Sequence, residues 1–142
     1  MFIAVDFDGT IVSHKYPEIG KEKPFAIDTL IKLQEDGHKI ILWTVREGDL
    51  LDNAVKFCAD RGLRFYAINS RYPGEAWSGS GVSRKLVADV YIDDSNLGGI
   101  PEWDTIYQMI SGKDPSNRRH KRKTALGRLI DRCKRSRRKF NK

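Results

Sequence analysis

The chain has 142 residues, 39% hydrophobic and 32% charged, which is enough apolar material for the core of one domain. No apolar stretch approaches the ~20 residues of a membrane span, and the N-terminus lacks the basic start of a signal peptide, so we expect a cytoplasmic protein without a transmembrane segment. Cys58 and Cys133 form no CxxC pair, which argues against a disulfide scaffold and a structural zinc site.

The formal net charge of +7 is unevenly distributed along the chain. Residues 113–142 carry a net charge of +12, whereas residues 1–112 carry −5. A run of turn-forming residues, 111–117, separates the two parts. We therefore predict a folded domain over residues 1–112, followed by a basic tail over 113–142 that is helical or disordered.

In chain order, apolar runs alternate with segments whose apolar residues recur at helical spacing. The expected elements are a strand at 2–5, a helix at 25–33, a strand at 39–43, a helix at 50–58, strands at 63–68 and 87–92, and a helix around 106–110. Residues 70–83, rich in Gly, Ser and Pro, are expected to form a loop. This alternation indicates an α/β fold with a Rossmann-like, mostly parallel sheet and helices on both faces.

Polar side chains follow three of the predicted strands at the point where each strand ends. They are Asp6, Thr44 and the pair Asp93-Asp94. Each of them, taken singly, is more often a turn former or a helix cap. Because parallel strands end at the same edge of a sheet, we expect these side chains to converge on one crevice. Clustered acids repel one another unless a cation holds them, which favours a functional site.

Four short segments, in this order along the chain, resemble the four motifs of the haloacid dehalogenase (HAD) superfamily. They are Asp6-Phe7-Asp8-Gly9-Thr10, Ile41-Leu42-Trp43-Thr44, Arg84-Lys85 and Tyr91-Ile92-Asp93-Asp94. The resemblance covers about residues 1–110 and does not extend to the basic tail.

The resemblance implies a phosphatase that hydrolyses phosphoric monoesters through an aspartyl-phosphate. Asp6 is expected to attack phosphorus as a carboxylate nucleophile. Asp8 is expected to be the general acid toward the leaving oxygen and then the general base for the hydrolytic water. An acid two positions after the nucleophile resembles the phosphatases of this superfamily, whereas its dehalogenases and ATPase pumps differ there.

The resemblance also implies a magnesium ion, which is content with few carboxylates plus water and phosphate oxygens. Its expected ligands are the carboxylate of Asp6, the backbone carbonyl of Asp8, and one or both of Asp93 and Asp94. The residues expected to bind the phosphorylated substrate are Gly9, Thr10, Thr44, Arg46 and Lys85. Thr44 and Lys85 are also expected to be catalytic, because a hydroxyl and an ammonium stabilise charge on the phosphoryl group. Two alternatives stay open: Lys85 as a solvated lysine at a helix end, and Arg46 as a surface arginine at the start of a helix.

The intervals between the motifs are too short for a cap domain, so we expect a capless member with an open crevice. Two segments are candidates for partly shielding it. One is residues 11–24, which follow the first motif and which we call the flap. The other is the loop at 70–83, which contains Trp77.

The basic tail allows three interpretations. It binds nucleic acid through phosphates, or it contacts an anionic membrane or a partner, or it is a solvated extension. The main alternative to a phosphatase is therefore a catalytically weak HAD-like scaffold whose tail binds nucleic acid. A two-component receiver domain fits less well, because its acid pair lies early in the chain, whereas here the pair comes late. The identity of the substrate and the oligomeric state stay open.

Overall fold

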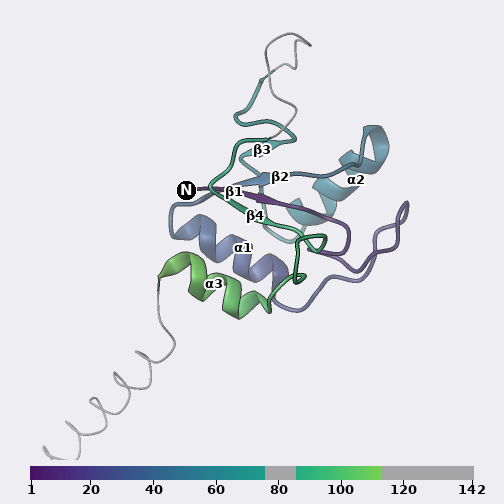
Figure 1. Ribbon diagram of the computed structural model, residues 1–142. Coiled ribbons are helices and arrows are strands. Elements are labelled where there is room, and N and C mark those ends of the chain that lie inside the picture. The colour runs from purple at the N-terminus through teal and green to yellow at the C-terminus, as the bar shows by residue number, and fades with distance from the viewer. Residues whose placement is uncertain (76–85, 113–142) are drawn as a thin grey trace, which may run out of the picture. The chain divides into compact units, whose positions relative to one another are not determined.

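The computed structural model describes residues 1–75 and 86–112. Its elements are β1 (Phe2–Val5), α1 (Ala26–Glu35), β2 (Lys39–Leu42), α2 (Gly48–Ala59), β3 (Ala67–Ile68), β4 (Val90–Ile92) and α3 (Trp103–Ser111) (Figure 1). Every strand and helix expected from the sequence is present in the expected order, so the α/β fold is confirmed. The predicted basic tail lies outside the described residues.

The chain divides into two compact units, Met1–Tyr107 and Gln108–Lys142, and the sheet belongs to the first. The strand order is β3-β2-β1-β4, and all strands pair in parallel. Val5, the last residue of β1, pairs with Leu42 of β2 on one side and with Ile92 of β4 on the other. The carboxyl ends of these three strands are therefore level with one another, and the residues that follow them meet at one edge.

The central strands are buried because their sequences are continuous apolar runs. Ile3, Ala4 and Val5 have no exposed surface, and neither do the three apolar residues of β2. A strand covered on both faces has no solvent side that would favour polar residues at alternate positions. This burial fixes the position of the polar residues that come directly after each strand.

Two strands are shorter than expected from the sequence. Strand β3 spans Ala67–Ile68 where 63–68 was expected, and β4 spans Val90–Ile92 where 87–92 was expected. Near β4 the Tyr91 hydroxyl donates to the carbonyl of Leu86 and accepts the N–H of Ala88 at 3.1 Å. Asp89 lies at a bend and stays bonded to β1, because its carboxylate accepts the N–H of Phe2 at 2.7 Å. Residues 86–89 are therefore held by these contacts outside the strand that they precede.

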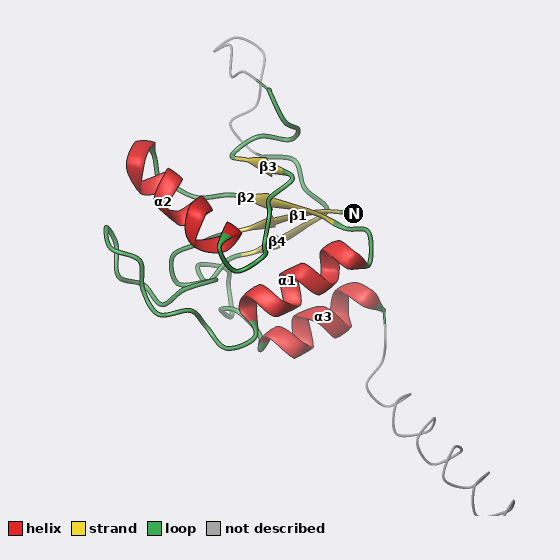
Figure 2. Ribbon diagram, turned by 180° about the vertical axis from the view of Figure 1, so that it is seen from behind, coloured by secondary structure: helices red, strands yellow, loops and turns green. Residues whose placement is uncertain are grey.

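Helix α1 begins at Ala26 because Phe25 adopts a left-handed conformation, with φ of 64°, which does not continue into a helix. The start of α3 lies beside α1, as both ribbon views show (Figures 1 and 2). The Tyr107 hydroxyl donates to the carboxylate of Asp36 at 2.6 Å, and the ammonium of Lys32 lies over the Tyr107 ring. No helix within residues 1–75 and 86–112 is long and apolar enough to cross a membrane.

Candidate functional site

Three carboxylates gather at the carboxyl edge of β1 and β4. Asp6 directly follows β1, and Asp93 and Asp94 directly follow β4. The N–H of Asp6 donates to the carbonyl of Ile92 at 3.0 Å, which continues the pairing of the two strands beyond their ends. One oxygen from each of the three carboxylates lies within 4.8 Å of the others. The cluster could hold a metal ion, and its donors are hard oxygens, as Mg²⁺ and Ca²⁺ prefer.

The surroundings of Asp6 disfavour its negative charge. Burial raises the pKa of its carboxyl from 3.8 to about 6, and the neighbouring Asp93 and Asp94 add to the increase. Hydrogen bonds from the backbone N–H of Phe7 and the hydroxyl of Thr10 act in the opposite direction but are outweighed. A cation bound between the three carboxylates would reverse this balance, because it would favour the ionised form. The donor set therefore fits a cation.

The loops after β1 and β4 interlock through Gly9, Thr10 and Asp94. The N–H of Asp94 donates to the Thr10 hydroxyl at 3.0 Å. Gly9 has φ of 89°, and a Cβ atom built there would lie 2.0 Å from the Asp94 carboxylate. Glycine is therefore required both by backbone conformation and by the close approach of the neighbouring loop.

Thr44 follows β2, the other neighbour of β1, and is held by Asn69. The Thr44 N–H donates to the side-chain oxygen of Asn69 at 2.8 Å, and the Asn69 amide donates to the Thr44 carbonyl at 2.9 Å. Asn69 directly follows β3 and has a left-handed φ of 48°. Its part in the site was not anticipated from the sequence, although a polar residue after a predicted strand is the same signal that identified Thr44.

Asp8 lies in different surroundings from the cluster, because its carboxylate pairs with Arg46. The Nε and Nη2 atoms of Arg46 donate to the two oxygens of Asp8 at 2.6 and 2.7 Å. Arg46 is completely buried, so the alternative of a surface arginine at the start of a helix is wrong. A buried guanidinium requires a partner, and the bidentate ion pair with Asp8 supplies it. Substrate contact by Arg46 stays a prediction.

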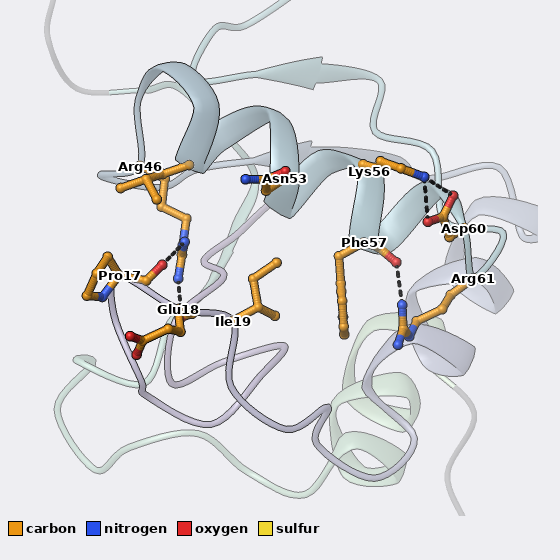
Figure 3. Close-up of a pocket in the computed structure, with 10 residues that line it drawn as sticks. Pro17, Glu18, Ile19, Arg46, Asn53, Lys56, Phe57, Asp60 and Arg61 are labelled. Carbon is orange, nitrogen blue, oxygen red and sulfur yellow. Dashed lines mark hydrogen bonds and ion pairs between the residues drawn. The ribbon is translucent and has the colours of Figure 1, made fainter.

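The same guanidinium also reaches the flap. It donates to the carbonyl of Pro17 at 2.8 Å and to that of Glu18 at 2.9 Å. The rings of Phe7 and Tyr16 lie 5.2 and 5.3 Å from its central carbon, within the range of cation–π contacts. Arg46 therefore joins the Asp6-to-Thr10 segment, the flap and the start of α2, and Figure 3 shows its two bonds to the flap.

A pocket of about 490 Å³ lies between the flap and α2 (Figure 3). Its walls are residues 17–19 of the flap, Arg46, and the face of α2 that includes Asn53 and Phe57, with Arg61 beyond the helix. The guanidinium of Arg61 stacks on the Phe57 ring at 3.5 Å and pairs with Glu22 at 2.9 Å. The charged groups Arg46 and Arg61 on the walls are therefore already paired within the protein.

The site residues expected from the sequence thus fall into three groups. The structure brings the carboxylates of Asp6, Asp93 and Asp94 together, with Gly9 and Thr10 beside them. Asp8 and Arg46 form a separate buried ion pair, and the Thr44 hydroxyl accepts the N–H of Arg46 at 3.2 Å. Lys85, its neighbour Arg84 and the loop residue Trp77 lie outside the described residues.

No family model and no curated protein matches the chain. A solved structure of a conserved protein, coded by a locus from Bacteroides thetaiotaomicron, is similar to it, with 57% sequence identity and a TM-score of 0.74. The match covers 82% of this chain and 94% of that one. At this identity and coverage, the chain belongs to the same family as the conserved Bacteroides thetaiotaomicron protein.

Proposed function

We propose that the protein is a Mg²⁺-dependent phosphatase that hydrolyses phosphoric monoesters through an aspartyl-phosphate on Asp6, with the Rossmann-like architecture and motif order of the HAD superfamily. The observation that carries the proposal is the carboxylate cluster of Asp6, Asp93 and Asp94 at the ends of two adjacent parallel strands. Ligands of open α/β sheets bind at this edge. The four HAD-like sequence segments add support from a different direction.

The residues that would hold the ion are Asp6, Asp93 and Asp94, together with the backbone carbonyl of Asp8. Mg²⁺ suits them, because it needs few carboxylates and takes its other oxygens from water and phosphate. When bound, it would neutralise charge on the phosphoryl oxygens and keep Asp6 ionised near neutral pH. Without a cation, a pKa of about 6 leaves part of Asp6 protonated near neutral pH, so the proposed nucleophile needs the ion to be fully ionised.

In the first step, a carboxylate oxygen of Asp6 attacks phosphorus, and the bond from phosphorus to the leaving oxygen breaks. Asp8, which is a carboxylate paired with Arg46 in the structure, must take up a proton before this step, and it then gives that proton to the leaving oxygen. In the second step, water attacks phosphorus, the bond to Asp6 breaks, and Asp8 accepts the proton of the water. The Thr44 hydroxyl donates to a phosphoryl oxygen, and Lys85 neutralises negative charge in both steps. Since Asp8 is regenerated in its protonated form, the cycle closes.

The test is hydrolysis of p-nitrophenyl phosphate and of a panel of phosphorylated metabolites, with Mg²⁺ and with EDTA. We expect Mg²⁺-dependent release of phosphate that is lost in Asp6→Asn. Asp28→Asn, an exposed acid in the first turn of α1, is the control and should retain the wild-type rate. Equal rates for the wild type and Asp6→Asn would overturn the proposal and favour a non-catalytic scaffold.

A further inference from the structure

Arg46 connects the proposed acid–base residue to the flap, and the proposed function assigns it no task beyond substrate contact. Its guanidinium donates two hydrogen bonds to Asp8 and one each to the carbonyls of Pro17 and Glu18. We propose that Arg46 is a positioning residue that holds Asp8 and the flap tip, residues 14–19, as one unit. The flap tip then leaves its place only if the orientation of Asp8 is also lost.

The base of the flap is closed by its own hydrogen bonds. The N–H of Ser13 donates to the carbonyl of Lys21 at 2.7 Å, and the Lys21 N–H donates to the Ser13 hydroxyl at 2.9 Å. Gly20 lies so close to this closure that a Cβ atom there would be 1.8 Å from the Ser13 carbonyl oxygen. The two sides of the flap therefore approach each other at its base without help from Arg46.

The tip has no comparable support. Residues 14–18 are exposed, and the pocket between the tip and α2 shows that the two are not packed tightly together (Figure 3). Within the described part of the chain, the hydrogen bonds that reach the tip from the rest of the domain are those of Arg46 to Pro17 and Glu18. The tip is therefore held by one buried side chain rather than by a packed apolar surface.

The chemistry of the guanidinium makes this coupling work in both directions. Its planar arrangement of donors serves two carboxylate oxygens and two carbonyls at once, which a lysine ammonium cannot do in the same geometry. If Asp8 loses its charge, the buried guanidinium loses the partner that compensates its own. A change at Asp8 should therefore loosen the flap tip, because Arg46 links the Asp8 side chain to it.

The coupling has a consequence for catalysis that rests on the proposed function. Asp8 must meet the leaving oxygen, whereas the phosphoryl group is bound by Thr44, Lys85 and the ion. Misplacing Asp8 should therefore impair departure of the leaving group more than binding of the phosphate. The effect should be largest for alkoxide leaving groups, which need a proton, and smallest for p-nitrophenolate, which departs without one.

The first experiment does not require catalysis. Backbone ¹⁵N relaxation is measured at the tip amides of Lys15, Tyr16 and Glu18 in the wild type, Arg46→Lys and Asp8→Asn. In both variants the order parameters of these amides should fall from about 0.85, typical of rigid backbone, to below about 0.6, whereas those of Ser13 and Lys21 at the base should stay unchanged. The control is Arg61→Lys, a change of the same chemistry in the same pocket at an arginine that does not contact Asp8. Its tip amides should relax like those of the wild type.

Wild-type order parameters at the tip amides in Asp8→Asn would overturn the proposal. This variant keeps the volume of the side chain, so it also decides the question if Arg46→Lys fails to fold. The outcome is independent of whether the protein hydrolyses any phosphate ester.

The second experiment compares kcat and KM for p-nitrophenyl phosphate and glycerol phosphate. For Arg46→Lys we expect kcat on glycerol phosphate to fall about 100-fold, the low end of general acid catalysis, and kcat on p-nitrophenyl phosphate to fall by about tenfold or less. KM should change little, and Arg61→Lys should match the wild type on both substrates. Equal losses of kcat on both substrates would overturn the positioning role. If the wild type hydrolyses neither these esters nor any member of the phosphorylated panel, the proposed function fails, and the relaxation experiment alone decides the coupling.

Discussion

Asp6 and Asp8 are separated by one residue, yet one carboxylate lies beside a cation and the other beside two further carboxylates. Asp8 receives a cation from within the chain, the buried guanidinium of Arg46. Asp6 faces two further carboxylates, and burial holds the pKa of its carboxyl at about 6. The charge of Asp8 is thus compensated within the chain, whereas that of Asp6 is not. The contrast distinguishes a carboxylate that could bind a metal ion from one whose orientation is fixed by its partner.

The largest effect on stability is expected when the cation that pairs with Asp8, the guanidinium of Arg46, is removed. Arg46→Met leaves the Asp8 carboxylate buried without a partner, and we expect the free energy of unfolding to fall by about 3–5 kcal/mol. Adding Asp8→Asn to the same variant should recover a large part of that loss, because the uncompensated charge is gone. Denaturant unfolding of the single and double variants measures both values.

Arg61→Met is the matched control for this prediction. Arg61 also stacks on a phenylalanine ring and pairs with a carboxylate, but its side chain is 40% exposed. Its loss should therefore cost about 1 kcal/mol or less. A similar cost for the two arginine variants would contradict the view that burial of the Asp8 pair makes the difference.

The contact between the two loops of the cluster gives the next largest effect. In Gly9→Ala, the new methyl group would meet the Asp94 carboxylate, in addition to the strain of a left-handed conformation. Gly37→Ala is a close control, because φ is 88° there and nothing lies within 4 Å of the added carbon. The control should cost about 1–2 kcal/mol for conformation alone, and Gly9→Ala about 1–3 kcal/mol more for the steric overlap. Equal unfolding free energies would show that the loop of Asp94 moves away freely.

The charge of Asp6, which has no cation partner within the chain, is tested by measuring how the free energy of unfolding depends on pH. The folded-state pKa of Asp6, about 6, lies above its ordinary value of 3.8, so the folded protein retains a proton that the unfolded chain releases. The contribution of Asp6 to stability is therefore present below about pH 4 and is lost as the pH rises to about 6 and above. Asp6→Asn removes that loss, and without divalent cations it should raise the free energy of unfolding at pH 7 by roughly 1–2 kcal/mol, since part of Asp6 remains solvated.

Asp28→Asn separates this effect from a general loss of negative charge. Asp28 is exposed, so its replacement should leave the dependence of unfolding free energy on pH as in the wild type. Saturating Mg²⁺ should flatten the wild-type curve between about pH 4 and 6, because the ion holds Asp6 ionised. A wild-type curve that already lies parallel to that of Asp6→Asn would contradict the raised pKa.

The cluster was predictable from the sequence, whereas the Arg46 pair was not. Asp6, Asp93 and Asp94 each follow an apolar run, and parallel pairing is enough to bring the ends of such runs to one edge. The surroundings of Arg46 depend on how the flap folds back from Ile11 to Lys23, which no local pattern specifies. An arginine two residues after a strand has the same sequence signature whether it faces solvent or fills the interior. Lys85 lies outside the described residues, and its role stays a prediction.

The shortened strands show a second limit of sequence patterns. Val87, Ala88 and Val90 suit a strand, but the Tyr91 hydroxyl binds backbone groups of Leu86 and Ala88, and the chain bends at Asp89. The competing contact comes from a side chain within the same apolar run, so alternation and hydrophobicity do not reveal it. Asn69 is different, because it follows a predicted strand as Thr44 does, and applying one rule to every strand end would have found it.

Asn69 also supplies a predicted effect, which is no larger than that of Asp6→Asn. Asn69 belongs neither to the Asp8–Arg46 ion pair nor to the carboxylate cluster. It holds the backbone of Thr44 by two hydrogen bonds, of 2.8 and 2.9 Å. Asn69→Ala should lower the free energy of unfolding by about 1–2 kcal/mol, since two hydrogen bonds are lost and the left-handed φ is retained. Asn69→Gly loses the same bonds but tolerates that φ, so the difference in unfolding free energy between the two variants isolates the conformational part.

If Thr44 binds the phosphoryl group as proposed, both variants should raise KM for p-nitrophenyl phosphate together, because both release the Thr44 backbone. A rise in KM for Asn69→Ala but not for Asn69→Gly would instead assign the effect to backbone strain at the end of β3.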